Sequence, residues 1–171
     1  MPRIRCPCRP GRSASLPQLS LHSPLGSLTL TQEDDALVAL DMGWGRDQEE
    51  TTLLREARDQ LHAYFDGDLP RFALPLAPVM ATPYRTRVWA ALSAIPFGET
   101  RTYADLAKIA GGSARSIGQA NSVNPLPILI PCHRVVAATH IGGFSMDGGL
   151  ETKRFLLSLE RRDRQQIGQA A

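Results

Sequence analysis

The fold and the chemistry of this chain are most strongly indicated by one stretch, residues 126–135, which reads Leu126-Pro127-Ile128-Leu129-Ile130-Pro131-Cys132-His133-Arg134-Val135. Two prolines stiffen an apolar segment that delivers a cysteine beside a histidine and an arginine. The thiolate is the reactive form of cysteine, and neighbouring imidazole and cationic groups favour it. Most lone cysteines are inert core residues, but this setting predicts a nucleophilic Cys132 that is held, ionised and exposed at the mouth of a cavity.

The segment upstream of this stretch predicts two short helices around a glycine turn. A capping box, Thr102-Tyr103-Ala104-Asp105, opens a helix over Tyr103–Ala110, and Ser113 caps a second helix over Ala114–Val123. Asn124-Pro125 ends the second helix, because a residue before proline is pushed out of the α region. The outline is typical of a helix-turn-helix, although a plain helical hairpin has the same spacing.

Small side chains recur on the second of these helices, at Ala114, Ser116, Gly118 and Ala120. They allow the helix backbone to approach another surface closely, and that surface is either DNA or a neighbouring helix. Arg115 stands among them. A planar cation there suits a gap in a base stack or a phosphate contact, and the alternative is an ordinary surface arginine.

The first half of the chain predicts a small α/β lobe. Residues 27–31 and 36–40 alternate like strands and are joined by a turn at Asp34-Asp35. Apolar residues at helical spacing over 51–65 predict a helix that ends at Gly67. The segment from Pro70 to Pro83 is proline-punctuated and predicts a linker.

Beyond the linker, Thr82-Pro83 begins a helix whose apolar face includes Val88 and Trp89. The last apolar face lies on a helix over Glu151–Glu160. These boundaries divide the chain into a flexible basic extension (1–20), an N-terminal α/β lobe (21–78) and a C-terminal DNA-binding and catalytic lobe (79–171).

Charge is distributed unevenly over these parts. Residues 1–20 carry four arginines and no acids, residues 21–81 have a net charge of −7, and residues 82–171 have a net charge of +5. The basic second half predicts that this part faces a polyanion. An odd cysteine count argues against a disulfide framework, and no apolar run is long enough to span a membrane, so we expect a cytoplasmic protein. Cys6 and Cys8 alone are a weak zinc signal, and we predict no metal and no cofactor.

Several of these features together resemble the O6-alkylguanine-DNA alkyltransferases, the methylated-DNA–protein-cysteine methyltransferases of direct repair. They are the cysteine motif, Asn124-Pro125, the Arg115 helix, the segment Gly98–Tyr103 and the late Gly142-Gly143-Phe144. The resemblance runs from about Ser23 to Glu160. It implies an α/β (α+β) protein with an N-terminal ribonuclease-H-like lobe, which carries a small antiparallel sheet. The C-terminal helical lobe would then hold a winged-helix-like helix-turn-helix and the active-site cysteine.

The resemblance also implies a reaction: irreversible transfer of an alkyl group, above all methyl, from O6-alkylguanine, and in some cases O4-alkylthymine, to Cys132. The thioether product has no easy route back, so each molecule reacts once. The resemblance implies a monomer that docks a helix in the minor groove of alkylated double-stranded DNA and flips the base, at a cost of a few kcal/mol.

The site residues that the resemblance implies fall into three groups. The catalytic group comprises Cys132 as acceptor, His133 as its base through a bridging water, Glu160 orienting that histidine, and Asn124 stabilising the turn. The DNA-binding group comprises Tyr103, Arg115, Ala114, Gly118, Thr82 and Thr102. The substrate pocket comprises Tyr103, Pro127, Val135, Phe144 and Ser145.

Two departures and two alternatives accompany this interpretation. Phe144 stands where a tyrosine is usual, which removes one hydroxyl contact, and Met146-Asp147 lengthens the glycine-rich loop. The first alternative is a non-catalytic helix-turn-helix sensor of alkylated DNA. The second is a thiol hydrolase, which would need an oxyanion site and multiple turnovers.

Overall fold

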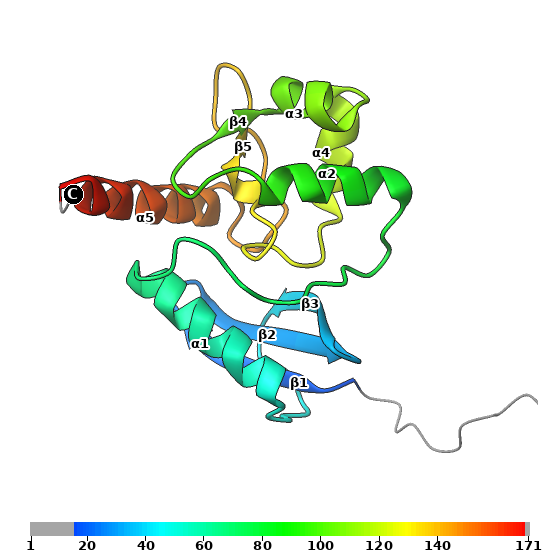
Figure 1. The fold of residues 1–171 in the computed structure, drawn as a ribbon, viewed down its shortest axis with the longest axis vertical. Helices are drawn as coiled ribbons and strands as arrows, with labels where there is room; N and C mark the ends of the chain where they lie inside the picture. Colours follow the sequence, from blue (N-terminus) through cyan, green and yellow to red (C-terminus); the bar gives the residue numbers. More distant parts are fainter. Residues whose placement is uncertain (1–15, 170–171) are drawn as a thin grey trace, which may run out of the picture.

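The N-terminal lobe is a three-stranded antiparallel sheet covered by one helix. The computed structural model describes residues 16–169, with side chains up to Arg161. Strands β1 (Gln18–Ser23), β2 (Gly26–Glu33) and β3 (Ala36–Met42) lie in the order β1-β2-β3, and helix α1 (Thr52–Asp66) packs on the sheet (Figure 1). The strands predicted at 27–31 and 36–40 and the helix predicted at 51–65 are confirmed.

Side-chain chemistry explains the limits of α1. The Thr51 hydroxyl accepts a hydrogen bond from the backbone N–H of Leu54, which satisfies one free donor of the first turn. Gly67 ends the helix in the left-handed conformation at φ 87°, which a residue without Cβ adopts at little cost. Leu54 and Leu61 are fully buried against the sheet.

The first strand differs from the prediction. Residues 18–20 were assigned to the basic extension, but they pair with β2, from Gln18 opposite Thr31 to Ser23 opposite Gly26. Leu19 and Leu21 are buried, so alternation of apolar and polar side chains does extend into this segment. Residues 1–15 of the predicted extension lie outside the described residues, as do Cys6 and Cys8.

The predicted linker runs along the edge of the sheet. Leu76 forms a parallel bridge with Leu37, whose backbone N–H donates to Pro75 O and whose carbonyl accepts from Ala77 N–H, at 2.9 and 2.8 Å. The linker thereby covers β3, whose edge would otherwise be open, before the chain enters the second lobe.

The C-terminal lobe is built from helices around a two-stranded parallel ladder (Figure 1). Its elements are, in order, α2 (Pro83–Ser93), β4 (Arg101–Thr102), α3 (Tyr103–Ala110), α4 (Ala114–Ser122), the 3-10 turn η1 (Cys132–Arg134), β5 (Val135–Val136) and α5 (Gly149–Gln169). The predicted caps Thr82, Thr102 and Ser113 all accept a hydrogen bond from a backbone N–H of the first helical turn. α4 ends one residue before its predicted end, and α5 continues nine residues beyond Glu160.

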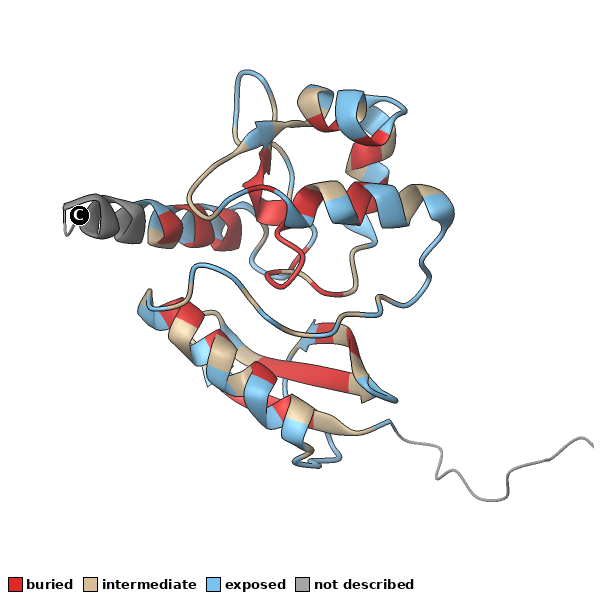
Figure 2. Ribbon diagram, in the orientation of Figure 1, coloured by how far each residue is buried: buried red, intermediate tan, exposed pale blue. Residues whose placement is uncertain are grey.

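The two lobes share one hydrophobic core. It extends from Leu28 in the sheet through Val88 on α2 and Ile117 on α4 to Leu156 on α5, all of which are fully buried. Figure 2 shows buried residues on the facing sides of both lobes. Within residues 16–169 no helix has the length and apolar character that crossing a bilayer requires.

Candidate active site around Cys132

Cys132 lies in the wall of a cavity in the C-terminal lobe. The cavity has a volume of about 320 Å³, within the range of small-molecule sites. Its wall is formed by Tyr103, Gly118, Asn121, Ser122, Cys132, Gly143, Phe144 and Ser145. The cysteine is only 4% exposed, but because it borders this opening, a ligand in the cavity reaches the sulfur without unfolding the lobe.

The sulfur is held by the side chain of Asn124. The Asn124 amide donates from Nδ2 to Cys132 Sγ at 3.3 Å and to Ile130 O at 2.9 Å, while its Oδ1 accepts from Leu126 N–H at 3.1 Å. One side chain therefore fixes both the turn after α4 and the thiol. Its predicted contact with the turn is present, and its contact with the sulfur was not foreseen.

The thiol differs from the ionised, exposed group that the sequence predicts. Burial raises the pKa of Cys132, and this outweighs the hydrogen bond from Asn124 and the charge of Lys153, which both lower it. The resting group is accordingly a protonated thiol at neutral pH. A sulfur in this environment becomes a nucleophile only when its proton is removed.

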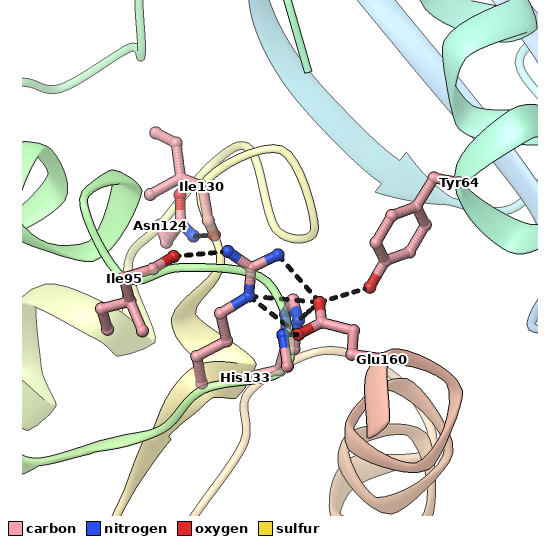
Figure 3. Close-up of polar contacts among 8 residues, drawn as sticks. Tyr64, Ile95, Asn124, Ile130, His133 and Glu160 are labelled. Carbon is pink, nitrogen blue, oxygen red and sulfur yellow. Dashed lines mark hydrogen bonds and ion pairs between the residues drawn. The ribbon is translucent and has the colours of Figure 1, made fainter. Parts of the chain in front are cut away.

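His133 and Glu160 are in direct contact, as Figure 3 shows, with 2.8 Å between His133 Nε2 and Glu160 Oε1. Burial alone would raise the pKa of Glu160, but the hydrogen bond from His133 and the hydrogen bonds and charge of Arg134 lower it to about 2. An ionised carboxylate only accepts, so Nε2 carries the proton. Burial lowers the pKa of His133, and the neutral ring thus presents an unprotonated Nδ1, which has no hydrogen-bond partner among the described residues.

Glu160 is the centre of a wider network that the sequence analysis missed in part. Arg134 donates to it from Nε and Nη2, both at 2.9 Å, and Gly98 N–H donates at 3.0 Å. Tyr64, on α1 of the other lobe, donates from its hydroxyl at 2.9 Å (Figure 3). In the sequence, Tyr64 is part of the apolar pattern of α1, and this pattern does not indicate that its hydroxyl binds Glu160.

Lys153 is a second functional residue that the sequence analysis missed. It is fully buried, and Nζ donates to Val135 O at 2.5 Å and to Gly143 O at 2.9 Å. Burial lowers its pKa to about 8. The signal was present in the sequence, because a lysine at position 153 shares a helix face with Leu156, Leu157 and Glu160. This side chain ties the loop at the cavity to α5 and places a positive charge near the sulfur.

Comparison with known proteins finds two family models that match this chain. A family model described as "6-O-methylguanine DNA methyltransferase, ribonuclease-like domain" matches residues 19–78, and the "DNA binding domain" of the same family matches residues 83–162. The chain belongs to the 6-O-methylguanine DNA methyltransferase family.

Individual members of this family match over most of their length. The constitutive methylated-DNA–protein-cysteine methyltransferase of Bacillus subtilis is 39% identical over 153 residues, covering 82% of this chain and 92% of that protein. A Mycobacterium leprae relative of the same name is 41% identical, covering 83% and 90%. The crystal structure of Mycobacterium tuberculosis O6-methylguanine methyltransferase superposes with a TM-score of 0.77 at 36% identity, covering 87% and 94%. A structure titled M. tuberculosis OGT in complex with DNA gives 0.76 at 38% identity, covering 85% and 93%. The family and the α/β fold expected from the sequence are confirmed.

The cavity of this methyltransferase contains some of the residues predicted for it and not others. Tyr103, Phe144 and Ser145 line it together with Cys132. Pro127 lines an adjacent hollow instead, which also includes Asn124. Val135 is fully buried and its carbonyl is engaged by Lys153, so neither residue forms part of the cavity wall in this structure.

Three further wall residues were missed, namely Asn121, Ser122 and Gly143. Asn121 is buried, and both atoms of its amide lack a hydrogen-bond partner among the described residues. Small or polar residues near the end of a helix give no distinctive pattern in a sequence.

The predicted DNA-facing residues of this methyltransferase have different surroundings. Arg115 and Ala114 are exposed at the start of α4, and Gly118 faces Tyr103, with 3.9 Å between a Cβ built at Gly118 and Tyr103 Cε1. Thr82 and Thr102 use their hydroxyls to cap α2 and α3. The turn between α3 and α4 contains two glycines with positive φ, 81° at Gly111 and 90° at Gly112. Among the described residues no group of three metal-ligating side chains is present.

Proposed function

We propose that Cys132 accepts an alkyl group from the O6 atom of an alkylated guanine in duplex DNA. The observation that carries this proposal is one sulfur in the wall of a cavity of about 320 Å³, beside a neutral histidine whose Nδ1 is unprotonated. The family reaction is methyl transfer to a protein cysteine, and Cys132 is the free cysteine among the described residues. The protein carries out direct DNA repair by this chemistry.

The reaction begins with removal of the thiol proton. His133 Nδ1 takes the proton from Cys132 through a bridging water, and the imidazolium that forms is stabilised by the ionised Glu160 2.8 Å away. The Asn124 amide and the charge of Lys153 stabilise the thiolate. Because the thiol is neutral at rest, these groups act when charge develops, which is where stabilisation accelerates a reaction.

Transfer is then a displacement at the alkyl carbon. Sγ forms a bond to the carbon, the bond between that carbon and O6 breaks, and its electron pair stays on the oxygen. The guanine that is regenerated takes up a proton and leaves the cavity. The thioether cannot return its alkyl group, so each molecule reacts once. Ionising an ordinary free thiol at neutral pH contributes about 2 kcal/mol, and the raised pKa of Cys132 makes this contribution larger. Holding sulfur and carbon in line supplies a larger share of the rate.

For the approach to DNA, we infer that α4 docks in the minor groove, where its small residues permit close contact. Arg115 fills the space left by the flipped base, and Tyr103 at the cavity wall turns the base inward. O4-alkylthymine is a second substrate on the same chemistry. Because its substrate is DNA, the protein acts inside the cell. We also propose that it acts as a monomer and uses no cofactor and no metal.

Intact mass measured after incubation with a duplex containing O6-methylguanine tests the transfer. We expect one methyl group per protein molecule, located by peptide mapping on Cys132, with Cys6 and Cys8 unmodified as internal controls. Cys132→Ala should bind the duplex and remain unmodified. A methyl group on Cys6 or Cys8 alone, or binding without any transfer, would refute the proposal and favour a non-catalytic sensor of alkylated DNA.

The role of Arg115 has a separate test. Arg115→Ala should slow transfer from duplex DNA while leaving transfer from the free modified base unchanged, because only the duplex contains a gap to fill. An equal loss on both substrates would refute this role.

A further inference from the structure

A second hollow, of about 450 Å³, is lined in part by the loop after β5, which also borders the lesion cavity. We call it the β5–α5 groove. The residues that line it include Thr100, His140, Ile141, Arg154, Ser158 and Arg161. The two arginines and Ser158 are spaced four, three and seven residues apart, so they form one stripe along α5. Figure 1 shows β4, β5 and the loop after β5 on the same side of the C-terminal lobe as the first turns of α5.

The groove is strongly basic, and none of the residues with described side chains that line it is acidic. Arg154 and Arg161 form no ion pair with any carboxylate among the described residues, whereas Arg58, Arg101 and Arg134 each do. Unpaired guanidinium groups that share a concave surface with hydroxyl groups are suited to an anion, because every N–H points outward as a donor.

His140 adds a further donor to the groove. Its Nδ1 accepts a hydrogen bond from the backbone N–H of Gly142 at 3.0 Å. The ring nitrogen that accepts is unprotonated, so in the neutral imidazole the proton is on Nε2, which donates. The residues that line the groove thus carry two guanidinium groups, one imidazole N–H and the hydroxyls of Thr100 and Ser158. A phosphate group, with oxygens that accept from several directions, matches this set.

We propose that the β5–α5 groove binds a phosphate of the DNA backbone beside the flipped base, an inference that rests on the proposed function. The groove and the lesion cavity are bordered by the same two segments of the chain. Ile141 lines the groove and Gly143, two residues later, lines the cavity; Thr100 lines the groove and Tyr103, three residues later, lines the cavity. A strand that delivers its base to Cys132 therefore passes the mouth of the groove.

The charge distribution of the chain supports DNA as the source of this phosphate. The groove lies in the part of the sequence with a net charge of +5, and the lobe opposite carries −7. A contact between the groove and a strand would add to the sequence-independent binding that phosphates supply.

Two matched double variants of the full chain test the proposal. Arg154→Gln with Arg161→Gln removes both guanidinium groups of the groove. Arg46→Gln with Arg55→Gln removes the same charge from exposed positions in the N-terminal lobe. Binding of each protein to a duplex is measured by fluorescence anisotropy over a range of salt concentrations, with thermal unfolding to verify the fold.

The expected result is a lower salt dependence for the groove variant alone. One phosphate contact contributes about 0.9 to the slope of log affinity against log salt concentration. Relative to 1 M salt, this corresponds to a gain of about 8-fold in affinity at 0.1 M salt. A slope equal to that of the control variant would overturn the proposal.

A chemical change in the DNA then locates the phosphate. Neutral methylphosphonate linkages replace the phosphates on either side of the lesion, one at a time. We expect one position to weaken binding of the wild-type protein about 8-fold and to have no further effect on the groove variant. Equal losses at every position in both proteins would show that no discrete phosphate is bound, and the proposal would fail.

Transfer assays separate this inference from the proposed function. The groove variant should methylate Cys132 with the free modified base as fast as the wild-type protein, since the lesion cavity is unchanged. If the wild-type protein shows groove-dependent binding but no transfer, the proposed function fails and the groove stands. If transfer occurs and the groove variant binds duplex like the control, the groove inference fails alone.

Discussion

The ionised Glu160 carboxylate should make the free energy of unfolding depend on pH in the acidic range. Its pKa is lowered in the folded protein from an ordinary value of 4.5 to about 2, so folding favours the ionised form. The stabilisation is therefore fully present above pH 4.5 and is lost as the pH falls toward 2. Each tenfold change in proton affinity is worth about 1.4 kcal/mol, so the whole effect is roughly 3 kcal/mol. This is a large fraction of the stability of a typical domain.

Glu160→Gln isolates this contribution, because glutamine keeps the shape of the side chain and does not titrate. At pH 7 the variant leaves Arg134 buried without a counter-charge, and we expect a loss of about 3 to 5 kcal/mol in the free energy of unfolding. The difference between wild type and variant should shrink as the pH is lowered from 4.5, because the wild-type carboxylate takes up a proton there.

Urea unfolding at a series of pH values between 7 and 2 measures this difference. Tyr64→Phe is the matched control: it removes one hydrogen bond to Glu160, worth about 1.5 to 3 kcal/mol, and retains the carboxylate. Its stability should fall with pH in parallel with the wild type. A difference between wild type and Glu160→Gln that stays constant down to pH 2 would refute the argument that this carboxylate is ionised and paired in the fold.

Three further changes have expected outcomes. Asn124→Ala removes the Nδ2 donor that lowers the thiol pKa, so the pH at which Cys132 reacts with iodoacetamide should rise; an unchanged pH profile would contradict the contact to sulfur. Lys153→Met leaves the carbonyls of Val135 and Gly143 without their buried donor. We expect the free energy of unfolding, measured in urea, to fall by about 1 to 3 kcal/mol and transfer to slow. Wild-type stability and rate would contradict this role of Lys153. Gly142→Ala places a Cβ 3.0 Å from Tyr103 Cε2 at a φ of 75°, so single-turnover transfer should slow, and a wild-type rate would show that the loop yields without cost.

Local signals in the sequence predicted much of the fold. Thr51, Thr82, Thr102 and Ser113 each begin a helix where the capping rule places it, because a cap depends on neighbouring residues alone. Strand β1 was missed because its two buried leucines follow a proline- and arginine-rich segment, and its pairing with β2 is a property of the folded sheet. The two-residue strands β4 and β5 are too short for any periodicity, and the residues that pair are 34 positions apart.

The sequence predicted Cys132, His133, Glu160 and Asn124 as site residues, and the structure shows two contacts among them. Asn124 donates to the Cys132 sulfur, and His133 contacts Glu160. Two features depend on how distant segments meet. The Tyr64 hydroxyl reaches Glu160 across 96 residues of sequence, and no local pattern records that contact. The protonation of Cys132 depends on how deeply the folded lobe buries the thiol, and sequence reasoning from its charged neighbours gave the opposite state.

The hydrogen bond from Tyr64 to Glu160 also means that the two lobes are not interchangeable parts. The carboxylate in contact with His133 also accepts a hydrogen bond from a hydroxyl of the N-terminal lobe, whose described residues do not line the cavity beside Cys132. If the second half of this chain were fused to the first half of another protein, Glu160 would lose the hydrogen bond that the Tyr64 hydroxyl donates. A successful chimera would have to import a tyrosine at this place in α1, and sequence similarity within the cavity alone would be a poor guide to which halves are compatible.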